Sequence, residues 1–322
     1  MSFVTPHNYL HIQQFVNCIH SSHANFHSVP DPLGPEDDVV IATSDRYGIS
    51  INTVFNKNTG LLRSNPYYSP EALELFYGNF YRDIYSTTHP DANCPKSSLL
   101  ALQVQTGIRI LNKARRLLPA IAHVLDYGGG IGGALLPFDE SGHRTMCVDY
   151  GDDYIEYGKR FGINGIVGGT GVIPEDLQFD LIILSHVLEH TLNPVDLISQ
   201  LCKKLAPNGL IFIDVPGLDW IHTVWKHNFQ SHLQNAHVWY FSRSTLTNIL
   251  LKSGITSLKW VGRTSCFCTP GVRSDFELLK PLQHLSLTRL NHYLFVNRLF
   301  ATLPSIFTKL SCKVVTKLFP HI

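Results

Sequence analysis

The segment HVLDYGGGIGGALLPF, residues 123–138, carries residue types and spacings suited to ligand chemistry. An apolar run ends in Asp126, and Gly128, Gly130 and Gly132 follow before a second apolar run begins. This pattern predicts a buried strand, a tight turn and the start of a helix. Glycines at such a turn let backbone N–H groups approach a bound ligand, because no Cβ stands in the way. A carboxylate at the strand end repels a pyrophosphate, so the segment favours a ligand that carries an ammonium group.

A second acid, Asp149, ends the apolar run at 145–149. An acid at this place typically accepts hydrogen bonds from both hydroxyls of a ribose, and the adjacent Tyr150 is placed to cover an adenine face. The glycines also satisfy the dinucleotide pattern G-x-G-x-x-G (128–133), which is weak support when taken alone. Asp126 favours S-adenosylmethionine over NAD, because the amino-acid end of that molecule carries an ammonium group.

With these segments the chain resembles class I S-adenosylmethionine-dependent methyltransferases. The matching segments are VLDYGGGIGG (124–133), VDY (148–150), FDLIILSHVLEHTLNPVDLISQLCKKLAPNGLIFIDVPG (179–217) and HVWYFSRSTLTNILLKSGI (237–255). Within the class, the chain is most similar to small-molecule methyltransferases of sugar and cell-surface polysaccharide biosynthesis. The resemblance implies S-adenosylmethionine as cofactor, bound by Asp126, Tyr127, Gly128, Gly130, Gly132, Asp149, Tyr150, Ser185 and His186.

The long loop 216–241 contains four histidines and several aromatic residues. Methyl transfer from a sulfonium requires in-line positioning and, for weak nucleophiles, a base. Related sugar C-methyltransferases carry the motif Y-H-E-H-L-S-Y-F-S here, with its last histidine as the base. The resemblance implies this role for His237 of HVWYFS, although Ala236 replaces the acid before it. A substrate contact and a structural role remain alternatives for His237.

The segment SHVLEH (185–190) follows the fourth predicted strand, and we expect His186 to lie near the transferred methyl group. HVLEH matches the inverted zinc-protease pattern, but that pattern requires a helix, whereas here a strand precedes it and a turn follows. Certain quinone-pathway methyltransferases bind a divalent ion through E-x-x-E-H at this place. Because His186 replaces the first acid, we expect no metal ion, and we expect Glu189 and His190 to stabilise the loop.

Residues 1–96 form a predicted accessory region. The runs at 39–43 and 49–55 predict a small hairpin. Related sugar methyltransferases often have a zinc ribbon here, but Asn56 and Thr59 stand where its cysteines would be, so we expect no structural zinc. Residues 69–86 predict a helix, which either packs on the main domain or acts as a lid that presents Tyr81 or Tyr85 to the substrate.

Between residues 97 and 270 strand and helix patterns alternate, which predicts an α/β fold. The expected architecture is a Rossmann-like, doubly wound and mostly parallel sheet with helical appendages at both ends of the chain. A long helix is predicted over 97–119. The expected strands are 122–127, 144–149, 164–168, 179–185, 208–215 and 257–265, and the helices between and after them are 132–138, 152–162, 194–205 and 243–253.

Residues 271–322 form a predicted helical C-terminal region, which from residue 278 onward contains basic residues and no acid. Helices at 287–303 and 306–319 either lie peripherally on an anionic membrane, through residues 285–319, or pack on the body or on a partner such as a second copy. The net charge of +1 gives no bias toward nucleic acid. Seven cysteines without a regular framework, and no signal or membrane-spanning segment, favour a cytoplasmic protein, with the inner membrane face as its only expected membrane contact.

The sequence therefore predicts methyl transfer to a small, sugar-like acceptor, either nucleotide-linked or lipid-linked. Its catalytic candidates are His237, Tyr81 and His186. An NAD-dependent sugar oxidoreductase or epimerase is one alternative, but SHVLEHTLNP lacks the Tyr-x-x-x-Lys pair that such an enzyme needs. A non-catalytic scaffold with the same fold is the other alternative, and the intact Asp126 and Asp149 argue against it.

Overall fold

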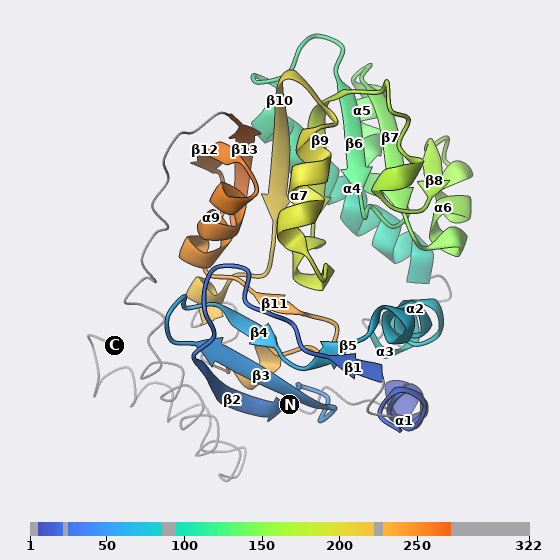
Figure 1. The fold of residues 1–322 in the computed structure, drawn as a ribbon. Coiled ribbons are helices and arrows are strands. Elements are labelled where there is room, and N and C mark those ends of the chain that lie inside the picture. Colours follow the sequence, from blue (N-terminus) through green and yellow to red (C-terminus); the bar gives the residue numbers. More distant parts are fainter. Residues whose placement is uncertain (1–5, 22–24, 86–94, 222–227, 272–322) are drawn as a thin grey trace, which may run out of the picture.

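The computed structural model describes residues 6–21, 25–85, 95–221 and 228–271. It has two sheets. A large sheet carries helices on both faces, and a smaller antiparallel sheet lies beyond the carboxyl ends of the parallel strands of the large one (Figure 1). Among the described residues, no helix is long and apolar enough to span a membrane.

The large sheet has seven strands in the order β12-β13-β10-β9-β6-β7-β8. Neighbouring strands pair in parallel from β10 to β8, whereas β13 runs antiparallel between β10 and β12. The strand order reverses between β6 and β9, and the crevice at such a point is the usual ligand site of this architecture. The strands are β6 (His123–Tyr127), β7 (Arg144–Asp149), β8 (Gly165–Val167), β9 (Phe179–Ser185), β10 (Leu205–Asp214), β12 (Ile255–Trp260) and β13 (Ser265–Pro270).

Both faces of this sheet are buried, which explains why its central strands are continuously apolar. In β9, Leu181 and Ile183 join the core under one set of helices, whereas Ile182 and Leu184 join the core under the other. The first set is α4 (Pro95–Ala114), α5 (Leu136–Glu140) and α6 (Asp152–Lys159), and the second is α7 (Pro194–Cys202) and α9 (Arg243–Lys252). The α/β doubly wound fold predicted from the sequence is confirmed.

The smaller sheet has the order β11-β4-β3-β2. Its strands are β2 (Asp38–Ser44), β3 (Ser50–Asn56), β4 (Leu62–Ser64) and β11 (Trp239–Tyr240). Three of them come from the N-terminal region, but β11 comes from the loop after β10 and pairs with β4 through Trp239 and Arg63. A two-stranded ladder of β1 (Phe26–His27) and β5 (Tyr67–Tyr68) and the helices α1 (Pro6–Ile19), α2 (Pro70–Asn79) and α3 (Tyr81–Tyr85) complete the accessory part.

Polar groups hold the accessory sheet together. The fully buried side chain of Arg63 donates to Asp38 (2.7 and 2.9 Å), to Glu36 (2.9 Å) and to a backbone carbonyl. Asn56 and Thr59, which we aligned in sequence with the cysteines of a zinc ribbon, both donate to the carboxylate of Asp31. A hydrogen-bond network therefore closes this turn.

Several elements differ from the sequence-based expectation. The predicted helix at 69–86 begins as expected, with the Ser69 side chain accepting the N–H of Ala72, but it is divided at Phe80 into α2 and α3. The predicted last strand at 257–265 is instead the hairpin β12–β13. The expected helices within 271–322, and their membrane or dimer contacts, lie outside the described residues, as do residues 222–227 of the long loop.

Candidate active site

The glycine turn directly follows β6 and has the backbone conformation that glycine favours. Gly128, Gly130 and Gly132 have φ values of 72°, 59° and 82°, in the left-handed region that side chains disfavour. The N–H of Gly128 donates to the carbonyl of Val148 (2.7 Å), which ties the turn to β7. A methyl group on Gly129 would lie 2.5 Å from the Asp126 carboxylate. The turn therefore wraps closely around that acid.

Asp126 and Asp149 form an acidic pair beside the turn. Asp126 is 3% exposed, and burial together with the charge of Asp149 raises its pKa to about 7. Asp149 accepts the N–H of Gly130 (2.8 Å) on one oxygen and that of Gly151 (2.7 Å) on the other. Each oxygen keeps a further lone pair for a ligand hydroxyl. Two neighbouring carboxylates, one of them costly to ionise, fit a ligand that brings a positive charge.

Two tyrosines flank this pair. Tyr150 is 74% exposed, so its ring is available to cover a ligand. Burial and the neighbouring Tyr150 raise the pKa of Tyr127 to about 12, so its hydroxyl stays protonated. The donors, acceptors and exposed ring fit the ammonium, ribose and adenine of S-adenosylmethionine.

At the carboxyl end of β9, Ser185 lies opposite Asp214 in the ladder and His186 turns the chain with φ 58°. The N–H of His186 donates to the carbonyl of Asp214 (2.8 Å), and its Nδ1 lies 3.2 Å from the Oε1 of Glu189. Loss of surrounding water lowers the pKa of His186, but the hydrogen bond and charge of Glu189 outweigh that effect and raise it to about 9. The side chain of His186 is 60% exposed, so it is accessible to a ligand.

A cavity of about 440 Å³ lies between this strand end and the accessory part. It brings together the three catalytic candidates, which come from three distant segments: Tyr81 from α3, His186 after β9, and His237 before β11. Most of the exposed surface of the cavity wall is apolar, and polar side chains and aromatic rings both contribute to it. Its lining residues are Tyr81, His186, Glu189, His190, Val215, Pro216, Gly217, Trp220, His232, Gln234, His237, Arg263 and Thr264.

The accessory sheet positions His237. Ser64 in β4 donates its hydroxyl to the carbonyl of His237 (2.8 Å) and its N–H to the carbonyl of Val238 (2.8 Å). The imidazole is 4% exposed and its ring centroid lies 4.8 Å from that of His190. Burial, and then the nearby His190 and His232, lower the pKa of His237 well below its usual value, so the ring is neutral.

Sequence reasoning assigned Glu189 and His190 to loop stabilisation, and it did not single out Arg263 or Gln234. The structure places all four in the cavity wall. Glu189 and His190 carried a signal in the HVLEH motif, but Arg263 follows β12 and has no local motif around it. Arg263 lies at the cavity because the unexpected β12–β13 hairpin turns there.

One family model and several solved structures are similar to this chain. Residues 103–259, just under half of the chain, match the family model described as a methyltransferase domain. No curated protein matches the chain. Solved structures similar to it include an S-adenosylmethionine-dependent methyltransferase from Archaeoglobus fulgidus (22% identity, 49% of this chain and 71% of that chain, TM-score 0.42). Others are DesVI of Streptomyces venezuelae (12%, 57% and 100%, TM-score 0.45) and PH0226 of Pyrococcus horikoshii (20%, 59% and 98%, TM-score 0.42).

The matched segment begins in α4 and ends in β12, so it contains the glycine turn, the acidic pair and most of the large sheet. Three observations support one assignment. They are the strand order of the large sheet, the match to the family model, and the fit of the glycine turn and its acidic pair to S-adenosylmethionine. Residues 103–259 match a methyltransferase domain and have the α/β doubly wound fold, and S-adenosylmethionine is the cofactor that the glycine turn and the acidic pair fit.

Proposed function

We propose that the chain transfers a methyl group from S-adenosylmethionine to a small, hydroxylated, sugar-like acceptor bound in the cavity. One observation carries the proposal: the glycine turn packs on a residue that directly follows the cavity wall in the chain. Val187, which follows the cavity residue His186, packs so closely on Gly128 that a Cβ there would lie 2.6 Å from it. A ligand at the turn and a ligand in the cavity are therefore neighbours, as the two substrates of a transfer reaction must be.

The size and lining of the cavity support the choice of acceptor. Its volume of about 440 Å³ lies within the range of small-molecule sites. Imidazole, carboxylate, amide and guanidinium groups in the wall offer hydrogen bonds to hydroxyls, and the rings of Tyr81 and Trp220 offer flat surfaces for a sugar face. A hydroxylated ring uses both parts of this lining, with its hydroxyls on the polar groups and its flat face on the apolar surface.

Bound S-adenosylmethionine supplies a methyl group that its positively charged sulfur has already activated. The chain contributes binding, orientation and exclusion of water. Asp126 and Asp149 bind the positive and hydroxyl groups of the donor, and Tyr81 from the accessory part contributes to the cavity wall. Within this proposal Ser185, next to His186, borders the donor.

The base role of His237 remains a prediction. Its neutral ring is able to accept a proton, but a pKa well below the usual value makes it a weak base in this environment. The substitution His237→Gln is expected to lower kcat while the dissociation constant for S-adenosylhomocysteine stays unchanged. His123→Gln, at the opposite end of β6, is the matched control and is expected to leave both quantities unchanged.

The purified chain with isotope-labelled S-adenosylmethionine tests the proposal against free, nucleotide-linked and lipid-linked sugars, with mass spectrometry to detect labelled products. Thermal shifts with S-adenosylmethionine, S-adenosylhomocysteine and NAD test the cofactor, and the first two are expected to stabilise the chain. Stabilisation by NAD alone contradicts the assignment. Donor binding without transfer to any acceptor of the panel contradicts the sugar-like acceptor and favours a non-catalytic relative.

A further inference from the structure

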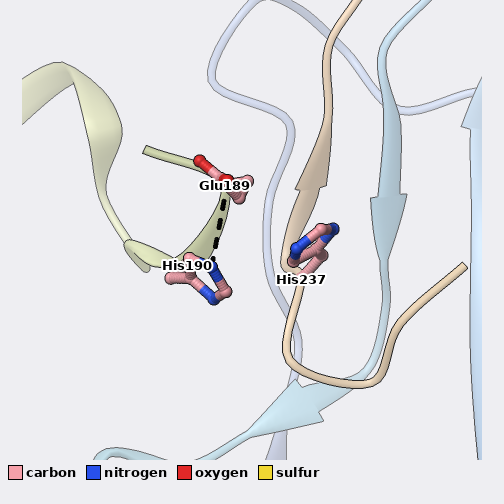
Figure 2. A group of neighbouring side chains, drawn as sticks. All are labelled: Glu189, His190 and His237. Carbon is pink, nitrogen blue, oxygen red and sulfur yellow. Dashed lines mark ion pairs between the residues drawn. The ribbon is translucent and has the colours of Figure 1, made fainter. Parts of the chain in front are cut away.

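Glu189, His190 and His237 converge on one point of the cavity. Each offers one ligand atom, and the three atoms lie within 4.8 Å of one another. Figure 2 shows Glu189 and His190 on adjacent positions of the turn after β9, with His237 facing them from the segment before β11. Some 46 residues separate His190 from Ala236, the neighbour of His237, so only the folded chain assembles this group.

Two buried atoms of the group have no hydrogen-bond partner among the described residues. They are the Oε2 of Glu189 and the Nδ1 of His237. Glu189 is 1% exposed and His237 is 4% exposed. A buried carboxylate oxygen without a partner is costly and uncommon, and it calls for a ligand that satisfies it.

His190, the third residue of the group, is oriented as a metal-binding histidine usually is. The Nδ1 of His190 lies 2.9 Å from the carbonyl of Ala236 and 3.1 Å from the hydroxyl of Tyr77, and in one of the two ring tautomers it donates its proton to the carbonyl. This hydrogen bond places the ring lone pair on Nε2, which lies 3.9 Å from the Oε1 of Glu189. A histidine that binds a metal through one nitrogen typically donates the other N–H to a carbonyl or carboxylate in this way. The Oε1 of Glu189 is held in turn by His186 (3.2 Å).

We propose that Glu189, His190 and His237 bind a divalent transition-metal ion, for which Zn²⁺ is the best match, with its open coordination position facing the cavity. Two imidazoles and one carboxylate suit zinc, whereas Mg²⁺ and Ca²⁺ prefer oxygen ligands throughout. Ligand atoms around tetrahedral zinc lie about 3.4 Å apart, because each bond is about 2.1 Å long. The two ligand atoms that lie farthest apart, up to 4.8 Å, must therefore approach each other by roughly 1.4 Å, which small side-chain rotations achieve.

This site departs from our expectation of no metal, which considered the continuous HVLEH motif and did not include His237. The role of the ion rests on the proposed function: it binds a hydroxyl of the acceptor and eases loss of the proton, which passes to solvent through the open cavity. His237 then contributes as a ligand of the ion. Binding of the ion itself does not depend on the identity of the acceptor.

The test uses the untagged full-length chain after removal of metal with a chelator. Zinc titration by calorimetry and the visible absorption of the Co²⁺ form are expected to show one ion per chain. Glu189→Gln and His237→Gln are each expected to weaken zinc binding by roughly 100-fold or more, because each removes a ligand. His232→Gln changes a histidine of the same cavity outside the group and is expected to keep zinc affinity within about threefold.

Retained binding of S-adenosylhomocysteine shows that each variant is folded, because the glycine turn lies outside the group. A wild-type chain that binds no stoichiometric zinc or cobalt overturns the proposal. Unchanged affinity in Glu189→Gln and His237→Gln, or an equal loss in His232→Gln, also overturns it. These readouts need no methyl transfer, so stoichiometric zinc with no product from any acceptor upholds the metal site and contradicts the proposed function alone.

Discussion

Replacing Asp126 with asparagine should make the ligand-free protein more stable and its cofactor complex weaker. Burial and Asp149 raise the pKa of Asp126 from 3.8 to about 7. Because the pKa of Asp126 is higher in the folded than in the unfolded protein, its ionisation lowers the free energy of unfolding. This loss of stability is absent below pH about 4, where the carboxyl is protonated in both states, and reaches its full size above pH about 7. A rise of about 3 units corresponds to about 4 kcal/mol at pH 8. The amide of asparagine also needs partners, so the expected gain is about 1–4 kcal/mol.

Cofactor binding should change in the opposite direction. Removal of the charge-assisted contact is expected to weaken binding by about 1–3 kcal/mol, or roughly 5- to 150-fold. Binding to the wild type requires an ionised Asp126, with its pKa about 7, and a protonated ligand amine, whose pKa is about 7.8. Affinity should therefore peak near pH 7.4 and be roughly sixfold weaker at pH 6. In Asp126→Asn the decline on the acidic side should disappear.

Calorimetry with S-adenosylhomocysteine from pH 6 to pH 8.5, and thermal unfolding of the ligand-free protein at pH 5 and pH 8, measure these effects. Asp139→Asn is the matched control, because the pKa of Asp139 is also raised but its carboxylate lies away from the glycine turn, beside Thr145. Equal affinity of wild type and Asp126→Asn at pH 7.4, together with equal thermal stability at pH 8, would refute the placement of the ammonium group.

Three further substitutions test the framework around the site. Arg63→Met leaves two carboxylates without their buried cation and should lower the free energy of unfolding in urea by about 3 kcal/mol; an unchanged midpoint would count against the ion-pair network. Gly107→Ala places a Cβ 2.1 Å from the carbonyl oxygen of Ala134, so it should lower the free energy of unfolding by at least about 1–3 kcal/mol and weaken binding of S-adenosylhomocysteine. Its control is Gly78→Ala, whose added Cβ meets nothing within 4 Å and should not destabilise the chain. Ser242→Ala removes the capping box of α9 and should cost about 1 kcal/mol in thermal unfolding; no loss would show that the cap is dispensable.

The arrangement of the glycine turn and the acidic pair was predictable from the sequence because its determinants are local. Asp126, the glycines and Asp149 lie within two short segments, and each segment specifies its own strand end and turn. Once two strands are parallel neighbours, their carboxyl ends meet at the same edge, so the acids come together without further information. The alternation of strands and helices predicted the sheet for the same reason.

The cavity could not be predicted in the same way, because its walls come from distant segments. Nothing near His237 shows that its ring will lie beside His190, since that contact depends on the pairing of β11 with β4. The strand β13 was missed because SCFCTP contains two cysteines and no valine or isoleucine, so its strand signal is weak. The division at Phe80 follows Gly78 and Asn79, two weak helix formers whose effect depends on packing.

The pairing of β11 with β4 has a consequence for the architecture of the whole chain. A segment that leaves the large sheet after β10 completes the small one and then returns to begin α9. Cutting the chain before α4 would remove the partners of Trp239 and Tyr240 and expose both of these fully buried rings. The two parts are therefore interlocked and are expected to unfold as one cooperative unit. The N-terminal part cannot be exchanged as a separate unit without rebuilding the cavity wall to which Tyr81 and His237 belong.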